Sequence, residues 1–345
     1  MKRDCMIGFF TDPFPDELLY SACARYHRKV RHISKATTSL YLFGTERTKM
    51  VVDFPTRLGH LAAQLPSHTY SVDILIDDNT LLPVFLPFTG AKQVEKLRGF
   101  MDGQGGMGIH GKIGLLTSGI RLKNLRFCVA CAAEDQTSYG QAYWHRLPQV
   151  PGVEVCPTHS LYLCESDVPM RSSSSYQGLL TAKEAIANLP PDRKTPRTLN
   201  PSDHEDGILL QLALGMASLL NTRFQPDQHL MRRRYANLLF ECGLASFAGV
   251  VKQGRLTTQF LKYYPPDFLA RLGCELKGRH TWLRRVMQGG KSARHPLHHL
   301  LLITFLGSTP EKFFQMPGEM RPFGDGPWPC LNQASSHFQE LRIAK

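Results

Sequence analysis

The sequence has no apolar run long enough to cross a membrane. The longest run, Leu300 to Leu306 with a threonine inside it, is far short of the roughly 20 residues that span a bilayer. The opening MKRDCMIGFFTDPFP holds too short an apolar stretch for a secretory signal peptide. We therefore expect a cytoplasmic protein without a membrane partner.

Nucleotide-binding signatures are also missing. There is no G-x-x-x-x-G-K-[ST], which argues against a P-loop ATPase. Gly103, Gly105 and Gly108 have the spacing G-x-G-x-x-G, but the helical pattern AKQVEKLRGFM precedes them. A dinucleotide fold requires a strand at that place. We interpret residues 102–114 as a flexible connector.

Acidic residues are scarce relative to basic ones. Against 29 Asp and Glu stand 41 Lys and Arg, which gives a formal net charge of +12. Such a balance favours a polyanionic partner, because each neutralised phosphate releases counterions. Nine Cys is an odd number in a chain without an export signal. A disulfide framework is therefore not expected, and closely spaced thiols are better interpreted as metal ligands.

Short helical patterns separated by prolines fill the N-terminal part of the chain. Residues 12–35 start with Asp16 and Glu17, which suit a first helical turn, and end in a basic run. Residues 54–66 predict a short helix, and residues 70–100 predict two more that LLPVFLPFTG interrupts.

Helical patterns return after residue 207. They cover DGILLQLALGMASLLN, QHLMRRRYANLLFECGL and RLTTQFLKYYPPDFLARLG. In HPLHHLLLITFLGSTPEKFFQ, Ser308 or Thr309 as a cap and Pro310 in the first turn predict a tight helix-turn-helix. The expected fold class is therefore mainly α, with a central zinc-finger ribbon of short β-strands.

This reading divides the chain into four parts. They are an N-terminal helical region over residues 1–101, a Cys/His segment over 102–168, a Ser- and Pro-rich linker over 169–206, and a C-terminal helical region with helix-turn-helix elements over 207–345.

The Cys/His segment carries the strongest chemical signal. Cys128 and Cys131 form a C-x-x-C pair, and Cys156 and His159 repeat that spacing. Zinc takes four ligands at tetrahedral corners, and a tight knuckle turns two of them toward one point. The residues between the pairs contain Gly and Pro turns with aromatic and β-branched residues, which favour short strands. We predict a zinc site with these four ligands.

The closed Cys3His set favours a structural ion, because it leaves no open position for water. Zinc deaminases also use two Cys at this gap, but they need an H-x-E motif, and here His110 is followed by Gly111 and Lys112. A zinc-dependent nucleic-acid enzyme remains the alternative from another functional class. It would need a carboxylate base beside the metal, for which Glu154 is the candidate.

Several motifs resemble one known family. The segment FCVACAAEDQTSYGQAYWHRLPQVPGVEVCPTH, the opening FPDELLYSACARYHR, FPTRLGHLAAQLP, TLLPVFLPF, HPLHHLLLITFLG and PFGDGPWPCLN are similar to the TnsD/TniQ family of transposon target-selection proteins. The resemblance runs from about residue 9 to about residue 333. Long TnsD proteins continue well beyond PWPCLN, so whether this sequence is a short member or a truncated one stays open.

The resemblance implies a non-enzymatic adaptor with a structural Zn2+. Such proteins bind a DNA attachment site, or in the TniQ type a CRISPR effector complex with its guide RNA, and recruit the AAA+ regulator TnsC. By the same resemblance Cys128, Cys131, Cys156 and His159 correspond to the zinc ligands of the family. The expected TnsC-facing residues are Phe14, Leu18, Leu19 and Tyr20. We prefer the DNA-bound, TnsD-like mode and keep the CRISPR-bound mode as the alternative.

Basic clusters in the C-terminal region predict where double-stranded DNA would bind. Thr257 and Thr258 open a candidate recognition helix, whose N-terminus could meet phosphate. Any one basic run can equally be a solvated helix face, but three clusters in one region favour nucleic acid. The predicted basic contacts are Arg232, Arg233, Arg234, Lys252, Arg255, Lys262, Arg279, Arg284, Arg285, Lys291 and Arg294. The protein would then be associated with the nucleoid.

Overall fold

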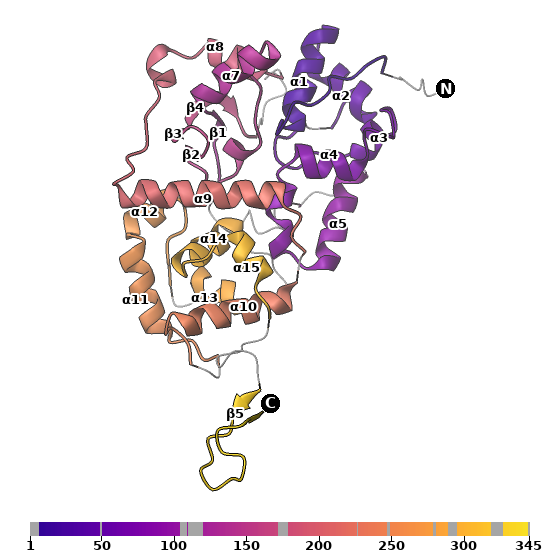
Figure 1. The fold of residues 1–345 in the computed structure, drawn as a ribbon. Coiled ribbons are helices and arrows are strands. Elements are labelled where there is room, and N and C mark those ends of the chain that lie inside the picture. The colour runs from indigo at the N-terminus through magenta and orange to yellow at the C-terminus, as the bar shows by residue number, and fades with distance from the viewer. Residues whose placement is uncertain are drawn as a thin grey trace.

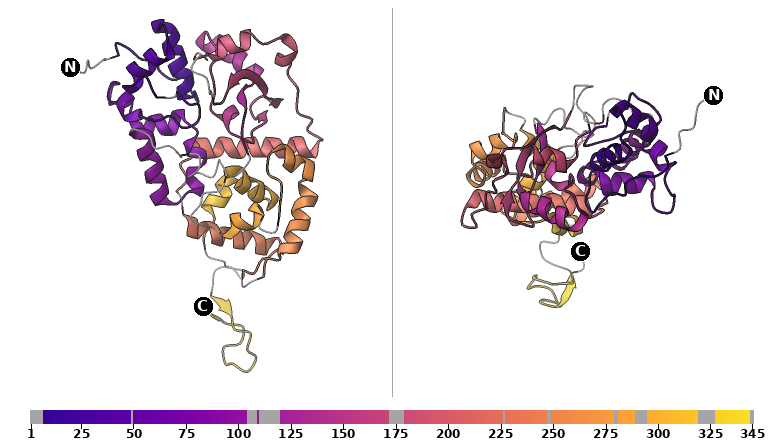
Figure 2. Two further views of the ribbon diagram at one scale, coloured as in Figure 1. Left: turned by 180° about the vertical axis from the view of Figure 1, so that it is seen from behind. Right: turned by 90° about the horizontal axis from the view of Figure 1, so that it is seen from above.

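The structure is a computed structural model that describes residues 7–48, 50–103, 109, 120–171, 179–225, 227–246, 249–278, 281–288, 295–318 and 327–343. Within these residues the fold is mainly α, as predicted, and the strands pair only as two-stranded sheets. Figure 1 shows helix α9 (His204–Asn221) crossing the middle of the molecule, with the remaining C-terminal helices on one side of it. The first N-terminal helices and the Cys/His unit lie side by side on its other side, while the helix over Ala91–Asp102 runs past the end of α9, next to the C-terminal helices (Figures 1 and 2).

The N-terminal region consists of short helices packed on one another. They are α1 (Leu19–Val30), α2 (Lys35–Phe43), α3 (Leu58–Ala62), α4 (Val72–Asn79) and α5 (Ala91–Asp102), with the 3-10 turns η1 (Leu82–Val84) and η2 (Leu86–Phe88) before α5. A proline stands in the first turn of both η1 and η2, so the predicted interruption at LLPVFLPF is confirmed. Helix α3 contacts α2, α4 and α5, so these four helices pack together as one group.

Helix α1 begins later than the sequence predicted. Asp16 has a left-handed backbone with φ 56°, and Glu17 lies before the helix instead of in its first turn. The Glu17 side chain is fully buried and accepts hydrogen bonds from Arg25, at 2.9 Å from Nε and 2.7 Å from Nη2. A buried carboxylate needs such a partner. Glu17 therefore forms a buried ion pair with Arg25 and does not lie in the first turn of the helix, where it would interact with the helix dipole.

The Cys/His unit combines short strands with one helix. Its elements are β1 (Asn124–Phe127), α7 (Val129–Tyr139), the 3-10 turn η3 (Leu147–Gln149), β2 (Val155–Cys156), β3 (Leu161–Tyr162) and β4 (Cys164–Pro169). Strand β1 pairs antiparallel with β4, and β2 with β3. Short strands were predicted between the two Cys pairs, but most of the residues that follow the first pair form helix α7, and β2 lies only at the second pair. Residues 129–139 are rich in good helix formers such as alanine, and Gly140 ends the helix with φ 74°.

Trp144 is a core residue of this unit. Its side chain is fully buried, and the indole N–H donates to the Leu180 carbonyl at 3.0 Å. Its backbone joins the unit to α1, because Leu18 N–H donates to the Trp144 carbonyl at 2.9 Å and Ser21 Oγ accepts from Trp144 N–H at 3.0 Å. The unit and the N-terminal helices therefore share one seam.

The described part of the predicted linker is packed and not free. It contains α8 (Ala182–Ala187) and the 3-10 turn η4 (Pro191–Lys194). Thr181 and Glu184 form a capping box at the start of α8, and Leu179, Leu189 and Leu199 are buried. The serine run at 172–175 lies outside the described residues. The linker was predicted from its content of Ser, Pro and charged residues. The buried leucines between the prolines explain why the segment packs against the rest of the chain.

The C-terminal region is built around α14 (Pro296–Phe305). The other elements are α10 (Gln228–Glu241), α11 (Gln253–Tyr263), α12 (Pro266–Arg271), α13 (Trp282–Gln288), α15 (Pro310–Gln315) and a hairpin of β5 (Trp328–Pro329) with β6 (Leu341–Ile343). Eight consecutive residues of α14, from Pro296 to Ile303, are buried. It packs against α9, α13 and α15 and so forms the centre of the helical core.

Helix α9 links all of these regions into one core. It contacts η1 of the N-terminal region, β2 and η3 of the Cys/His unit, and α14 and α15. Arg146 strengthens the same junction, because its buried guanidinium donates to Asp16 Oδ1 at 2.8 Å and to the Asp77 carbonyl at 2.7 Å. In the described ranges no helix is long and apolar enough to span a bilayer.

Candidate metal centre and nucleic-acid interface

Two turns bring the four predicted zinc ligands to one point. Cys128 is the N-cap of α7 directly after β1, and Cys131 lies in the first turn of that helix. Cys156 ends β2, and His159 lies in the turn between β2 and β3. That turn closes with a hydrogen bond of 2.9 Å from Ser160 N–H to the Cys156 carbonyl. Each pair thus occupies a local knuckle.

The distances between the ligand atoms fit a tetrahedral zinc ion. All four atoms lie within 4.8 Å of one another. Usual zinc bond lengths give tetrahedral edges of about 3.8 Å between two sulfurs and about 3.6 Å between a sulfur and a nitrogen. Cys131 Sγ and Cys156 Sγ are 3.7 Å apart. His159 Nδ1 lies 3.3, 3.5 and 3.7 Å from the sulfurs of Cys131, Cys156 and Cys128. The residues present therefore suit a Cys3His zinc site.

A carboxylate that the sequence reading missed orients the histidine. Glu134 Oε1 lies 2.9 Å from His159 Nε2, and this hydrogen bond raises the pKa of His159. Nε2–H donating to Glu134 leaves Nδ1 free to face the sulfurs, the usual arrangement behind a zinc-bound histidine. Glu134 follows Cys131 by one helical turn on α7, so the spacing i, i+3 was the signal available.

The thiols of the site influence each other's ionisation. Hydrogen bonds from Cys128 and Cys131 lower the pKa of Cys156. The pKa of Cys131 is raised by its hydrogen bonds with Cys128 and Cys156. Thiols this close together compete for ionisation. A bound cation removes that competition, and metal uptake is expected to release protons.

The donor set points to a structural role for the metal. Three cysteines and a histidine fill the four positions of a tetrahedral ion and leave none for a substrate. Glu154, the base that an enzyme would need, lies 3.4 Å from Arg271 Nε and pairs with it. Arg271 also pairs with Glu205 at 3.3 Å. Glu154 thus joins the unit to α12 and α9.

The residues predicted to face TnsC are packed inside this chain. Leu18, Leu19 and Tyr20 are 0%, 1% and 8% exposed. Phe14 lies against the rings of Tyr139 and Tyr143, with centroids 4.6 and 5.1 Å away. Leu18, Leu19 and Tyr20 thus lie in the seam between α1 and the Cys/His unit, whereas Phe14 is half-buried beside it. Their contact with TnsC stays a prediction. Apolar side chains before a helix mark its buried face as readily as an interface.

The arginine run on α10 divides into an exposed and a buried part. Arg232 and Arg233 are exposed. Arg234 is buried, donates from Nε to the Met316 carbonyl at 2.8 Å, and has its pKa lowered by burial. Since successive helical residues are 100° apart, three adjacent arginines cannot share one face. Arg234 is therefore a structural residue and not a DNA contact.

The predicted recognition helix starts earlier than expected. Helix α11 begins at Gln253, with Lys252 as N-cap, so Thr257 and Thr258 lie in its second turn and do not meet a phosphate at its N-terminus. Lys252, Arg255 and Lys262 are exposed. The tight turn at Thr309 is confirmed, because Thr309 Oγ1 accepts from Lys312 N–H at 3.4 Å, but the α14 helix before it is buried.

The fold brings two basic clusters to neighbouring helices. Helices α10 and α13 pack against each other, and α13 carries the exposed Arg284 and Arg285. We call Arg232, Arg233, Arg284 and Arg285 the basic face. None of the four has an ion-pair partner among the residues that the structure describes. The predicted contacts Arg279, Lys291 and Arg294 lie outside the described ranges.

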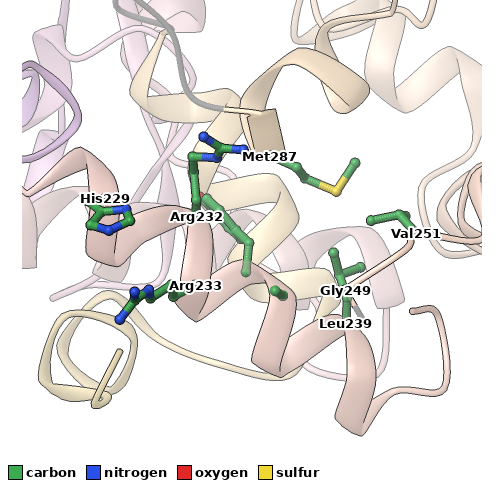
Figure 3. A pocket seen from close by; sticks show the side chains of 9 residues that line it. His229, Arg232, Arg233, Leu239, Gly249, Val251 and Met287 are labelled. Carbon is green, nitrogen blue, oxygen red and sulfur yellow. The ribbon is translucent and has the colours of Figure 1, made fainter. Parts of the chain in front are cut away.

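A pocket of about 330 Å³ opens beside the basic face (Figure 3). Arg232, Arg233 and His229 from α10 contribute its polar lining. Its apolar lining comes from three segments and consists of Tyr235, Ala236, Leu239, Gly249, Val251 and Met287. Val251 adjoins Lys252, so the third basic cluster begins at the edge of the same pocket. The arrangement suits an anionic ligand that also offers apolar surface.

Two family models match separate parts of the chain. A family model described as TniQ matches residues 9–163, and one described as Tn7-like transposition protein D, TnsD, matches residues 212–345. The chain is 29% identical over 152 residues to transposon Tn7 transposition protein TnsD of Escherichia coli. That alignment covers 44% of this chain and 30% of the E. coli protein. All four metal ligands fall within the first match and the whole basic face within the second.

Proposed function

This chain belongs to the TnsD/TniQ family, and we propose that it selects the target site of a Tn7-like transposon by binding duplex DNA and recruiting the AAA+ regulator TnsC. The similarity to a protein named for Tn7 transposition supports this role. DNA recognition is assigned to the C-terminal helices, partner recruitment to the N-terminal half, and structural support to the metal.

The basic face carries the DNA-binding part of the proposal. Four exposed guanidinium groups on two packed helices lack a carboxylate partner in the described part of the chain. Unpaired surface cations repel each other, and a phosphate backbone relieves that repulsion and releases counterions. The planar guanidinium also matches phosphate oxygens in a bidentate geometry. Duplex DNA is the partner with this charge pattern that the family suggests.

The metal supports this function from a distance. When bound, zinc supplies a cross-link between the turn that starts α7 and the turn between β2 and β3. Trp144 and Arg146 then connect the cross-linked unit to α1 and to α4. The unit thereby fixes the N-terminal helices against α9, whose far side carries the C-terminal helices.

A salt titration tests the DNA assignment. We would compare the wild-type chain with Arg232→Ala/Arg233→Ala and with Arg284→Ala/Arg285→Ala, measuring Kd for duplex DNA between low and moderate salt. Each lost phosphate contact should reduce the slope of log K against log salt by about 0.9. The matched control is Lys92→Ala/Lys96→Ala, which removes two exposed cations from α5.

The outcomes separate the two modes of the family. Reduced slopes for both arginine pairs with an unchanged control support direct DNA binding. A wild-type affinity that does not depend on salt would contradict it. Co-purification with a guide-RNA complex together with that flat dependence would favour the CRISPR-bound mode instead.

A further inference from the structure

A second pocket lies in the N-terminal half, at the end of α9. Its volume is about 630 Å³, in the range of roughly 300–1,000 Å³ that is typical of binding sites. Helices α4 and α5, the turns η1 and η2, and the segment after α9 line it. These elements lie beside one another in Figures 1 and 2.

One face of α5 forms a wall of the pocket. Ala91, Val94, Glu95 and Arg98 line it, and their spacing i, i+3, i+4, i+7 is that of a single helical stripe. The cationic neighbours on the same helix, Lys92 and Lys96, are not among the lining residues. The pocket therefore receives the acidic side chain of α5 and excludes its lysines.

The floor of the pocket is apolar. Leu220 and Pro87 are buried there, while Leu86, Val94 and Phe224 are half-buried and retain surface that a ligand can cover. Phe224 is held in place by Phe314, whose ring stacks on it at 4.5 Å. Covering this surface would supply hydrophobic free energy to a partner.

The rim of the pocket has unneutralised negative charge. Its three arginines are already engaged: Arg98 with Asp73 and Asp77 at 2.7 and 2.5 Å, Arg223 with Asp77 at 3.5 Å, and Arg146 with Asp16. Asp78 and Glu95 are exposed and have no ion-pair partner among the described residues. In a chain with a net charge of +12, this local excess of carboxylate is unusual.

We propose that this pocket is the docking site for an amphipathic, cationic segment of a protein partner. Lys or Arg side chains of that segment would meet Asp78 and Glu95, and its apolar face would cover Val94, Leu86 and Phe224, as in helix-in-groove recognition. DNA does not fit this charge pattern, because the carboxylates repel phosphate. The inference rests on the proposed function, since TnsC is the partner that the function requires. This surface is separate from Phe14, Leu18, Leu19 and Tyr20, the contacts expected from the sequence.

Binding of purified TnsC from the same transposon to the 345-residue chain tests the site. The principal variant is Asp78→Lys/Glu95→Lys, and the matched control is Glu46→Lys/Glu241→Lys, which reverses two exposed acids outside the pocket. A second variant, Leu86→Ala/Val94→Ala, trims the apolar floor and keeps every charge. Far-UV circular dichroism and thermal melting verify that each variant folds, and DNA affinity is measured in parallel.

We expect the pocket charge reversal to weaken TnsC binding at least about tenfold, mostly through a slower association rate, because like charges then face each other. The floor variant should weaken binding through faster dissociation, and the control should bind as the wild type does. DNA binding should not weaken in any of them. Unchanged TnsC affinity in both pocket variants would overturn the docking site and leave the proposed function standing. A wild-type chain that binds DNA but not TnsC would overturn the recruitment part of that function, and the docking site with it.

Discussion

Helix α7 of the Cys/His unit and helix α14 of the C-terminal core are stabilised in different ways. Of the residues in α7 only Asp135 is buried, and strands β2 and β3 are two residues long. Helix α14 buries eight consecutive residues. Burial of apolar surface therefore stabilises α14, whereas α7 has little of it and depends on the ligand cluster at its N-terminus. A chain can replace a missing core with a cross-link, which is what small metal-binding units generally do.

Removing one metal ligand should give the largest effect. Cys156→Ser should abolish binding of about one zinc per chain, which elemental analysis measures, and unfold the unit around α7. A structural zinc contributes roughly 10–16 kcal/mol in isolated finger peptides. Cys242→Ser, which changes an exposed thiol on α10's C-terminal side, should retain both metal and fold. A metal-free Cys156→Ser protein with native protease resistance would show that burial alone orders α7.

The buried ion pair at the start of α1 should give the next largest effect. Arg25→Met leaves the carboxylate of Glu17 buried without its partner, and we expect a loss of about 3–5 kcal/mol in the free energy of unfolding. Arg28→Met breaks a pair with Glu184 whose side chains are 46% and 36% exposed, and such pairs contribute about 0–1 kcal/mol. Urea unfolding of both variants measures the difference. Equal losses would contradict the assignment of Glu17 to the interior.

Truncating a buried leucine should lower the stability of the helical core. Leu212 is fully buried in α9, and Leu214 on the same helix is 53% exposed. Leu212→Ala should lower the free energy of unfolding by about 2–5 kcal/mol, because it removes buried apolar surface and leaves a cavity. Leu214→Ala should change it by no more than about 0.5 kcal/mol. Thermal unfolding of the two variants compares them directly, and a small effect of Leu212→Ala would mean that this core repacks.

The smallest predicted effect concerns pH. His295 caps α14 through Nδ1, which accepts from Leu297 N–H at 3.2 Å. Burial lowers its pKa from 6.5 to about 3. At a pH between about 3 and 6.5, His295 binds a proton in the unfolded chain but not in the folded chain. The free energy of unfolding should therefore fall by up to about 1.4 kcal/mol per pH unit as the pH drops below 6.5.

His295→Asn isolates this contribution. Asparagine keeps a side-chain acceptor at the cap and does not titrate, so the difference in unfolding free energy between wild type and variant should shrink as the pH falls. Comparing the two proteins cancels the acid loss of zinc, which both share. A difference that stays constant between neutral pH and pH 4 would mean that His295 is protonated in the folded state.

Local patterns in the sequence predicted much of the fold. Proline positions located the breaks around α3, η1, η2 and α12, and the cap at Thr309 was identified from its sequence. The start of α1 was predicted wrongly, because a buried ion pair there outweighs the helix dipole. The helix over Val129–Tyr139 was not predicted, although its alanines favour a helix.

The candidate sites also contain some features that the sequence predicted and others that it did not. The metal ligands were predictable because each pair occupies one knuckle, so spacing along the chain is nearly spacing in space. Glu134 was accessible only through helical geometry. Which arginine of α10 turns inward depends on the position of Met316, 82 residues away along the chain. Leu18 and Leu19 are buried because the Cys/His unit packs against this part of the chain.

The sequence alone thus determined the helical class, the four clustered Cys and His residues that could hold a metal, and the excess of positive charge, since these follow from local propensity, short spacing and composition. Tertiary structure alone decided which charges stay unpaired. It buried Arg234 and paired Arg271, left the four arginines of the basic face exposed, and gathered Asp78 and Glu95 at the rim of an apolar pocket. The physical reason is that the electrostatic role of a charge depends on its neighbours in space, which only the packed helices bring together.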